Sequence, residues 1–108
     1  MTDRELLEAA ARAVGYEIHA KWQAERDDAG YGAVGLWLQS GHTGWNPLTD
    51  DAAAFRLAAS LGLVVDFSRP SAALPFTRHE YTLSEGGNNP EATRRAIVRA
   101  AAQIGGKQ

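Results

Sequence analysis

The loop Trp45-Asn46-Pro47 carries the side chains best suited to binding a small molecule. A tryptophan in an irregular segment ahead of a helix presents a flat apolar face, and Asn46 offers two donors and an acceptor. The N-terminus of the predicted helix that follows adds unpaired backbone N–H groups, which suit an anion. Together these groups can hold a planar, polar ligand. In the alternative interpretation, Trp45 covers the core as a structural plug and Pro47 stiffens the turn.

Basic side chains gather near the C-terminal end of the sequence. Residues 88–108 carry four of them against a single acidic one. Arg95 and Arg99 are four residues apart, so they share one face of a helix, and Arg94 adjoins them. Guanidinium groups match phosphate oxygens, which makes this helix a candidate anion clamp. The alternative is a solvated helix face. The segment lacks the aromatic residues of a stacking platform, which argues against nucleic acid as a partner.

Asp50 and Asp51 could serve acid–base or metal chemistry, or could complement the dipole of the helix that they begin. Successive helical residues point about 100° apart, which favours the dipole interpretation. His42 is the best candidate among three histidines, because it lies in a glycine-bounded loop near Trp45. No histidine is spaced for a shared metal site and the chain has no cysteine, so we expect no metal, no cofactor and no catalytic residue. The predicted ligand-binding residues are His42, Trp45, Asn46, Asp50, Asp51, Arg94, Arg95 and Arg99.

Gly30, Gly32 and Gly35 have the spacing of a dinucleotide-binding fingerprint. That mechanism requires a strand before the glycines and a helix N-terminus after them. Here a strand, Leu36-Trp37-Leu38, is predicted after them instead. We therefore interpret the glycines as a flexible hairpin loop.

The hydrophobic periodicity predicts an α+β fold with the order α-β-β-α-β-β-α. Thr2 and Glu5 form a capping box for the first helix, and Asn89 with Pro90 begins the last. Four strands are expected to form a small antiparallel sheet with three helices packed on it, in helix-sheet-helix layering. The predicted helices cover residues 3–14, 50–61 and 90–104, with Thr49 capping the second and Gly15, Gly62 and Gly105 ending them. The predicted strands cover residues 16–23, 34–39, 63–67 and 77–83, with loops over residues 24–32 and 68–75.

The length of 108 residues fits one domain, residues 1–108, with a small core that we expect a homo-oligomer, most simply a C2 dimer, to complete. The absence of cysteine excludes disulfides and thiolate metal sites, and is compatible with a reducing cytoplasm. The net charge of −2 gives no general attraction to nucleic acid or anionic membranes. No apolar run is long enough to span a bilayer and no signal peptide is visible, so we expect no membrane association.

Three stretches resemble the phage ABA-sandwich domain family of small bacteriophage and prophage proteins. They are Gly15-Tyr16-Glu17 after the first helix, Trp45-Asn46-Pro47-Leu48-Thr49-Asp50-Asp51 with Arg56-Leu57-Ala58, and the run from Ala92 to Ala101 with Ile104-Gly105. This chain has Ala52-Ala53 where the family pattern leads us to expect a Gly-Asp pair. Any role of that aspartate is therefore absent from this chain or is performed by another residue. The resemblance implies a small phage accessory protein with helix–sheet–helix layering, and no known reaction.

The preferred functional hypothesis is a non-enzymatic homo-oligomer in the host cytoplasm that sequesters a phosphorylated or nucleotide-like small molecule, as a counter-defence protein. Its basis is the aromatic loop and the arginine-bearing helix, on a domain without a catalytic constellation. The alternative is a protein that inhibits a host defence complex through its surface, with the charged segment Glu25-Arg26-Asp27-Asp28 as a contact. A nucleotide-acting enzyme using His42, Asp50 and Asp51 is the third hypothesis.

Overall fold

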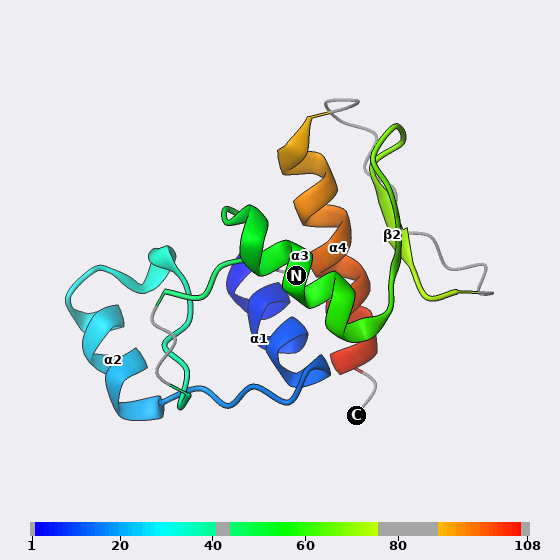
Figure 1. The fold of residues 1–108 in the computed structure, drawn as a ribbon. Coiled ribbons are helices and arrows are strands. Elements are labelled where there is room, and N and C mark those ends of the chain that lie inside the picture. The colour runs from blue at the N-terminus through cyan, green and yellow to red at the C-terminus, as the bar shows by residue number, and fades with distance from the viewer. Residues whose placement is uncertain (1, 41–43, 76–88, 107–108) are drawn as a thin grey trace.

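The computed structural model describes residues 2–40, 44–75 and 89–106 of the chain. Over these ranges the protein is an α+β fold with four α-helices and one two-stranded antiparallel sheet (Figure 1). The elements in order are α1 (Asp3–Ala13), α2 (Ala20–Asp28), the 3-10 helix η1 (Gly32–Val34), α3 (Asp51–Leu61), β1 (Val64–Asp66), β2 (Ser71–Ala73) and α4 (Pro90–Gly105).

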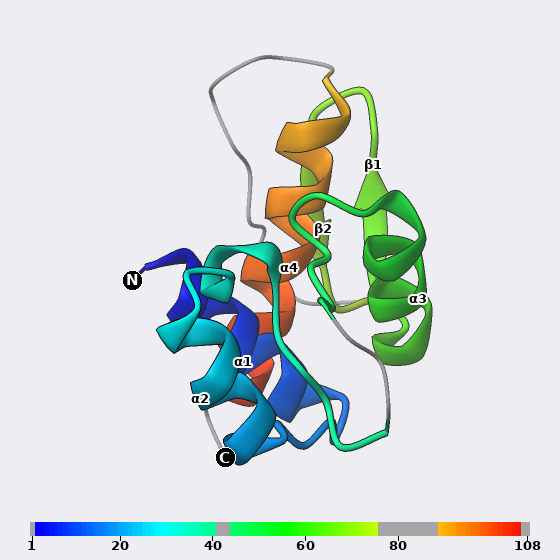
Figure 2. The same ribbon diagram turned by 90° about the vertical axis from the view of Figure 1, so that its left-hand side faces the viewer.

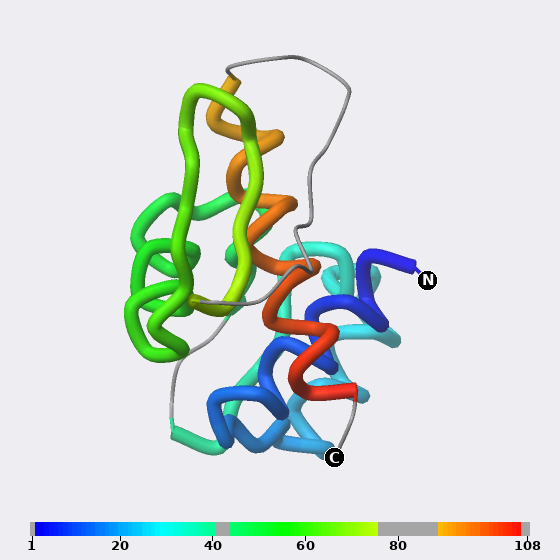
Figure 3. The backbone as a smooth tube through the Cα atoms, turned by 90° about the vertical axis from the view of Figure 1, so that its right-hand side faces the viewer, coloured from blue at the N-terminus to red at the C-terminus, as the bar shows by residue number. Residues whose placement is uncertain are grey.

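Helix α4 is the centre of the fold, because it contacts α1, α3 and both strands. α1 lies along one side of α4, whereas α3 and the β1–β2 hairpin lie on another (Figures 1 and 2). The backbone tube shows α1 beside the C-terminal half of α4 (Figure 3). α2 lies beyond α1, on the side away from the hairpin (Figures 1 and 2). The described core therefore forms around one helix, and not around a central sheet as we predicted.

Small residues bring α1 and α4 close together. Ala9 and Ala10 of α1 and Ala96 and Ala101 of α4 are completely buried. A Cβ atom on Gly105 would overlap the carbonyl oxygen of Ala9, so the contact requires glycine at this position. We predicted that Gly105 would end the last helix from outside it, but Gly105 is itself the last helical residue. Its function is to permit close helix packing.

The capping predictions for the first and last helices are confirmed. The Thr2 hydroxyl accepts a hydrogen bond from the backbone N–H of Glu5, and the Glu5 carboxylate accepts one from the N–H of Thr2, both at 3.1 Å. The side chain of Asn89 accepts from the N–H of Ala92 at 2.7 Å. Gly62 ends α3 with a φ of 65°, a left-handed conformation that costs other residues about 1 kcal/mol.

The strand predicted over residues 16–23 is wrong. Only an isolated bridge between Ile18 and Leu38 forms there, and the chain then enters α2. Helix α2 also occupies most of the loop predicted over residues 24–32, and η1 follows it. The order of elements therefore begins with two helices, where we expected a helix and a hairpin.

The reason that residues 20–28 form a helix is local. The His19 imidazole caps it, because its Nδ1 accepts a hydrogen bond from the backbone N–H of Trp22 at 3.2 Å. Alanine, lysine, glutamine, glutamate and arginine fill most of the helix, and these residues favour it over a strand. The alternating pattern assigned Trp22 to the buried face, yet Trp22 is 42% exposed while Gln23 is buried. The alternation of apolar and polar residues over residues 16–23 is therefore a weaker determinant here than the helix propensities of residues 20–28.

The return strand predicted over residues 34–39 is reduced to isolated bridges. The N–H of Leu36 donates to the carbonyl of Trp45, and the N–H of Trp45 donates to the carbonyl of Leu36, both at 2.9 Å. Leu36 and Leu38 are nonetheless fully buried. This segment contributes its side chains to the core without belonging to a regular sheet.

The strand predicted over residues 63–67 is confirmed in shortened form as β1. Residues 68–75, predicted as a loop, instead contain β2, which pairs antiparallel with β1 so that Val64 lies opposite Ala73. The strand predicted over residues 77–83 lies outside the described residues. Within the described ranges, the structure has two paired strands where the predicted sheet had four.

Asp66 organises the tight connection between β1 and β2. Its carboxylate accepts hydrogen bonds from the backbone N–H groups of Ser68 at 2.9 Å and Arg69 at 3.2 Å, and from the Ser68 hydroxyl at 2.7 Å. The Ser68 hydroxyl and these amides lower the pKa of Asp66. A single side chain therefore stabilises the turn. The prolines that bound this segment in the sequence do not indicate that role.

Candidate functional site

The Trp45-Asn46 loop is part of the fold's own hydrogen-bond network. Trp45 is half-buried and meets Tyr16 edge-on, with ring centroids 5.5 Å apart. Asn46 is buried, and its Oδ1 accepts a hydrogen bond from the N–H of Leu48 at 3.0 Å while its Nδ2 donates to the carbonyl of Val34 at 3.2 Å. Both ends of the amide thus serve the turn, which favours the structural interpretation of this loop.

The first turn of α3 differs by one residue from the prediction. Asp50, and not Thr49, is the N-cap, because its carboxylate accepts a hydrogen bond from the N–H of Ala52 at 3.0 Å. Thr49 belongs to the preceding turn, where its hydroxyl donates to the carbonyl of Asn46 at 3.3 Å. Asp51 is in the first helical turn, as expected. Its side chain is 79% exposed and remains accessible to a ligand.

Arg94 is the predicted arginine that reaches this segment. From α4, its Nε donates a hydrogen bond to the carbonyl of Leu48 at 2.8 Å, and its Nη1 donates to the Asp51 carboxylate at 2.6 Å. The Arg94 side chain is 20% exposed. These two bonds hold the guanidinium against the beginning of α3, so Arg94 and Asp51 do come together, as an ion pair.

Arg95 and Arg99 face a different helix. Arg95 donates two hydrogen bonds to the Asp3 carboxylate of α1, at 2.9 and 3.2 Å, and this pairing lowers the pKa of Asp3. The Arg99 charge acts on Asp3 in the same direction. Because neighbouring helical residues are about 100° apart, Arg94 points elsewhere. Within one subunit, therefore, the three arginines do not converge. His42 lies outside the described residues, so its role stays a prediction.

A hollow of about 530 Å³ opens between α3, α4 and β1. Apolar side chains provide most of its lining, among them alanines of α3, Ile97 of α4 and Val65 of β1. The polar residues in its described lining are Asp51, Thr93 and Arg94. Small-molecule sites commonly have this volume and this mixture of apolar walls with a few polar groups. The hollow is therefore the candidate site, and it includes two of the predicted residues.

Two phenylalanines that no sequence pattern singles out also line the hollow. Phe55 on α3 is 72% exposed, and Phe67, directly after β1, is 67% exposed. Phe55 could have been noticed, because it lies beside the buried stripe of its helix and not within it. Phe67 could not have been placed, because its position depends on a hairpin whose second strand was not predicted.

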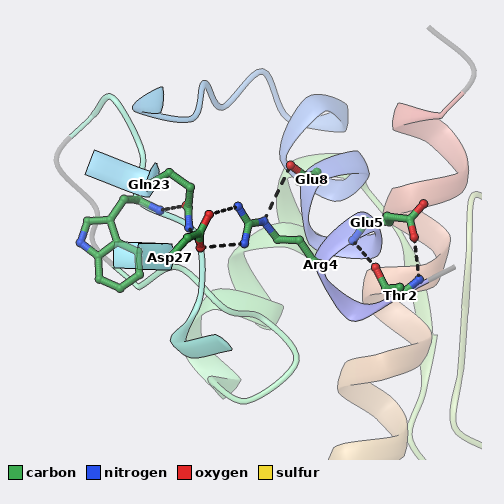
Figure 4. Close-up of polar contacts among 7 residues, drawn as sticks. Thr2, Arg4, Glu5, Glu8, Gln23 and Asp27 are labelled. Carbon is green, nitrogen blue, oxygen red and sulfur yellow. Dashed lines mark hydrogen bonds and ion pairs between the residues drawn. The ribbon is translucent and has the colours of Figure 1, made fainter. Parts of the chain in front are cut away.

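A second polar cluster fastens α2 to the rest of the molecule (Figure 4). Arg4 of α1 donates two hydrogen bonds to the Asp27 carboxylate, at 3.1 and 3.0 Å. Gln23 donates to Asp27 at 3.1 Å, and its Oε1 accepts from the backbone N–H of Trp37 at 2.9 Å. The bonds from Arg4, and then that from Gln23, lower the pKa of Asp27. We call these four residues the α2 latch.

The Gly30, Gly32 and Gly35 run lies beside the α2 latch. A Cβ atom on Gly32 would overlap the Asp27 carboxylate, and one on Gly35 would lie 2.6 Å from the carbonyl oxygen of Trp45. The residues after Gly35 lead into the bridge with Trp45, and no helix begins there. Gly32 and Gly35 therefore permit close packing of the chain, whereas Gly30 has a φ of 85° and open space around it, and the context of a dinucleotide fingerprint is not present.

Comparison of the chain with protein-family models, with curated proteins and with solved structures gives no match. Among the residues that the structure describes, no group of three or more His, Cys, Asp or Glu side chains is placed to hold a metal ion. Residues 2–40, 44–75 and 89–106 also contain no helix that is long and apolar enough to cross a membrane.

Proposed function

We propose that this protein is a non-enzymatic binding protein that takes a small anionic ligand into the hollow between α3, α4 and β1. The observation that carries the proposal is the Arg94 guanidinium, held by Leu48 and Asp51 in the lining of a mostly apolar hollow of about 530 Å³. A half-buried guanidinium held in a fixed position is a strong donor to an anion. The apolar walls can contribute affinity for the ligand, but they offer no catalytic groups.

On the resemblance to the phage ABA-sandwich domain family, we propose that the ligand is a phosphorylated or nucleotide-like molecule that the protein sequesters in the host cytoplasm. Sequestration requires binding without turnover. The two acids that an enzyme would use are already engaged, because Asp50 caps α3 and Asp51 pairs with Arg94. These engagements favour a binding protein over a nucleotide-acting enzyme.

A thermal-shift screen of nucleotides and other phosphorylated small molecules tests this proposal. A ligand at 100 times its Kd should stabilise the protein by about 2.7 kcal/mol. Arg94→Gln should remove the shift, whereas Arg12→Gln, at an exposed position on α1, should leave it unchanged. The proposal is wrong if no compound raises the Tm, or if the shift survives Arg94→Gln.

We also propose that the protein is a homo-oligomer, most simply a C2 dimer. Phe55 and Phe67, which both line the hollow, are more than half exposed, and monomers seldom expose large apolar side chains near each other. A second copy placed over them would cover the mouth of the hollow. Sedimentation velocity at micromolar concentration should show a dimer that Phe55→Ser weakens, and a strict monomer would contradict this proposal.

The same exposed side chains favour one alternative, in which the protein inhibits a host defence complex through its surface. Phe55 and Phe67 would then contact the partner protein. Pull-down from host lysate should capture one partner with the wild-type chain and lose it with Phe55→Ser combined with Phe67→Ser. Equal recovery with both chains would remove this alternative.

A further inference from the structure

The charges around the hollow restrict what it can bind. Arg94 is the one basic side chain in its described lining, whereas Asp51 is in the same lining and Asp50 precedes it. Arg95 is engaged with Asp3 on another side of α4. An anion bound at Arg94 therefore meets one positive charge that is already paired with the Asp51 carboxylate. This arrangement accommodates a single negative charge and disfavours a polyphosphate.

The Arg94 guanidinium is fixed before any ligand arrives. Its Nε is bonded to the Leu48 carbonyl and its Nη1 to Asp51, while Nη2 has no hydrogen-bond partner among the described residues. The free edge can donate to a ligand oxygen without breaking the Leu48 anchor. Among the described residues an anion competes only with Asp51, whose side chain is 79% exposed, so the ion pair that is given up is a weak one.

The rest of the lining favours an apolar ligand body. Ala54, Ala58, Val65 and Ile97 offer no hydrogen bonds from their side chains, and Thr93 is the remaining polar side chain in the described lining. A nucleobase buried here would leave polar groups on its edge unpaired, which is costly. A hydrocarbon ring or chain has no such groups.

We infer that the hollow binds an amphipathic organic monoanion, with its single acidic group on Arg94 and a hydrocarbon body against α3, α4 and β1. The inference rests on the proposed binding of a small anion in the hollow, and it takes an amphipathic monoanion in place of a nucleotide-like ligand. It explains in one arrangement why the hollow has a fixed guanidinium, one competing carboxylate and otherwise apolar walls.

Two fluorescent probes that differ in charge test the inference. 8-Anilino-1-naphthalenesulfonate has an aromatic body and one sulfonate, whereas N-phenyl-1-naphthylamine has the same body without the charge. Arg94→Gln should weaken binding of the sulfonate about tenfold and leave the neutral probe unchanged, because a hydrogen bond to a charged group is lost. Asp51→Asn should tighten the sulfonate about threefold by removing the competitor.

Matched substitutions locate the probes. Ala59→Trp places a large side chain in the hollow and should weaken both probes, whereas Ala24→Trp, exposed on α2, should weaken neither. Arg12→Gln is the charge control. Circular dichroism melting of each variant separates lost binding from lost folding, and Asp51→Asn tests the charge argument even if Arg94→Gln is unstable.

The outcomes separate the inference from the proposal on which it rests. Equal losses of both probes in Arg94→Gln, or a sulfonate that Asp51→Asn weakens, would overturn the monoanion assignment. Displacement of the probes by ATP more effectively than by an aromatic monocarboxylate would also overturn it, yet leave the proposed binding function standing. Probe affinities that Ala59→Trp does not change would remove the hollow as a site, and the proposed function with it.

Discussion

α1 and α2 are joined to the rest of the molecule in opposite ways. α1 buries Leu6, Leu7 and three successive alanines against a core built around α4. α2 buries a single side chain, Gln23, and the α2 latch holds it in place. Apolar burial contributes about 25 cal/mol for each Å² removed from water, whereas a partly exposed ion pair contributes under about 1 kcal/mol. α2 should therefore open at a lower free energy than α1.

The aromatic residues around α2 reinforce this difference. Trp22 stacks on His19 with ring centroids 3.9 Å apart, and the Arg26 guanidinium lies 5.6 Å from the ring centroid of Trp37. In α1 and α4, by contrast, alanines are in direct contact with the opposite helix. Trp22 thus lies on the surface of the α2 region, whereas small residues allow the close approach of α1 to α4.

The largest effect is expected from Gly105→Ala. The new Cβ would overlap the carbonyl of Ala9 and force α1 away from α4, which should cost about 3 kcal/mol of stability. Chemical denaturation followed by circular dichroism measures this loss. Gln103→Ala, exposed on the same helix, is the control and should be nearly neutral. A Gly105→Ala variant as stable as wild type would show that α1 and α4 do not pack as closely as described.

Gln23→Leu should have a smaller and more local effect. It leaves the buried N–H of Trp37 without its acceptor, a loss of about 1–2 kcal/mol confined to the α2 region. Amide hydrogen exchange should quicken in α2 and remain unchanged in α1 and α4. Lys21→Ala, exposed on the same helix, should preserve the slow exchange. Loss of protection throughout the molecule would mean that α2 and the core unfold as one unit.

Acid should loosen α2 before α1. Hydrogen bonds from Arg4, and then from Gln23, lower the folded-state pKa of Asp27 below its ordinary value of 3.8. The stabilisation is therefore complete above that value and is lost as the pH falls through the lower, folded-state pKa. Asp3 follows the same rule at the α1–α4 contact, but apolar packing remains there when Asp3 is protonated.

Amide exchange followed from about pH 5 to about pH 2 should therefore show α2 losing protection first. High salt should shrink the effect, because both partners of the Arg4–Asp27 pair are partly exposed. Asp27→Asn should make the protection factors of α2, corrected for the intrinsic exchange rate, independent of pH over this range. If α1 loses protection at the same pH as α2, the two attachments do not differ in the way described.

Sequence periodicity predicted the elements that bury apolar stripes and failed for those that do not. α1, α3 and α4 carry such stripes with recognisable caps, so their positions were correct to within one or two residues. α2 has no apolar stripe, and its one buried side chain is polar. β2 is only three residues long, too short for any period to be visible. Hydrophobic periodicity detects elements that bury apolar side chains, and it does not detect elements whose buried side chains are polar and hydrogen-bonded.

The candidate site was predictable in its composition but not in its position. Arg94 and Asp51 were each predicted as ligand-binding residues, but the ion pair between them was not predicted. The divergence of Arg95 follows from one step of about 100° around the helix, and which arginine faces α3 depends on how α4 docks. The hollow forms only because the β1–β2 hairpin lies beside α3. The spacing of residues in the sequence does not predict this long-range arrangement.

The pairing of α1 with α4 also constrains the order of folding during synthesis. α1 leaves the ribosome long before Pro90, the residue at which its main partner begins. Until then it is an isolated helix of 11 residues, below the length of about 12–15 at which such helices persist in water. The closing step joins segments far apart in the chain, which slows folding for a helical protein of this size. Nascent chains that stop before α4 would present Leu6 and Leu7 to chaperones and to one another.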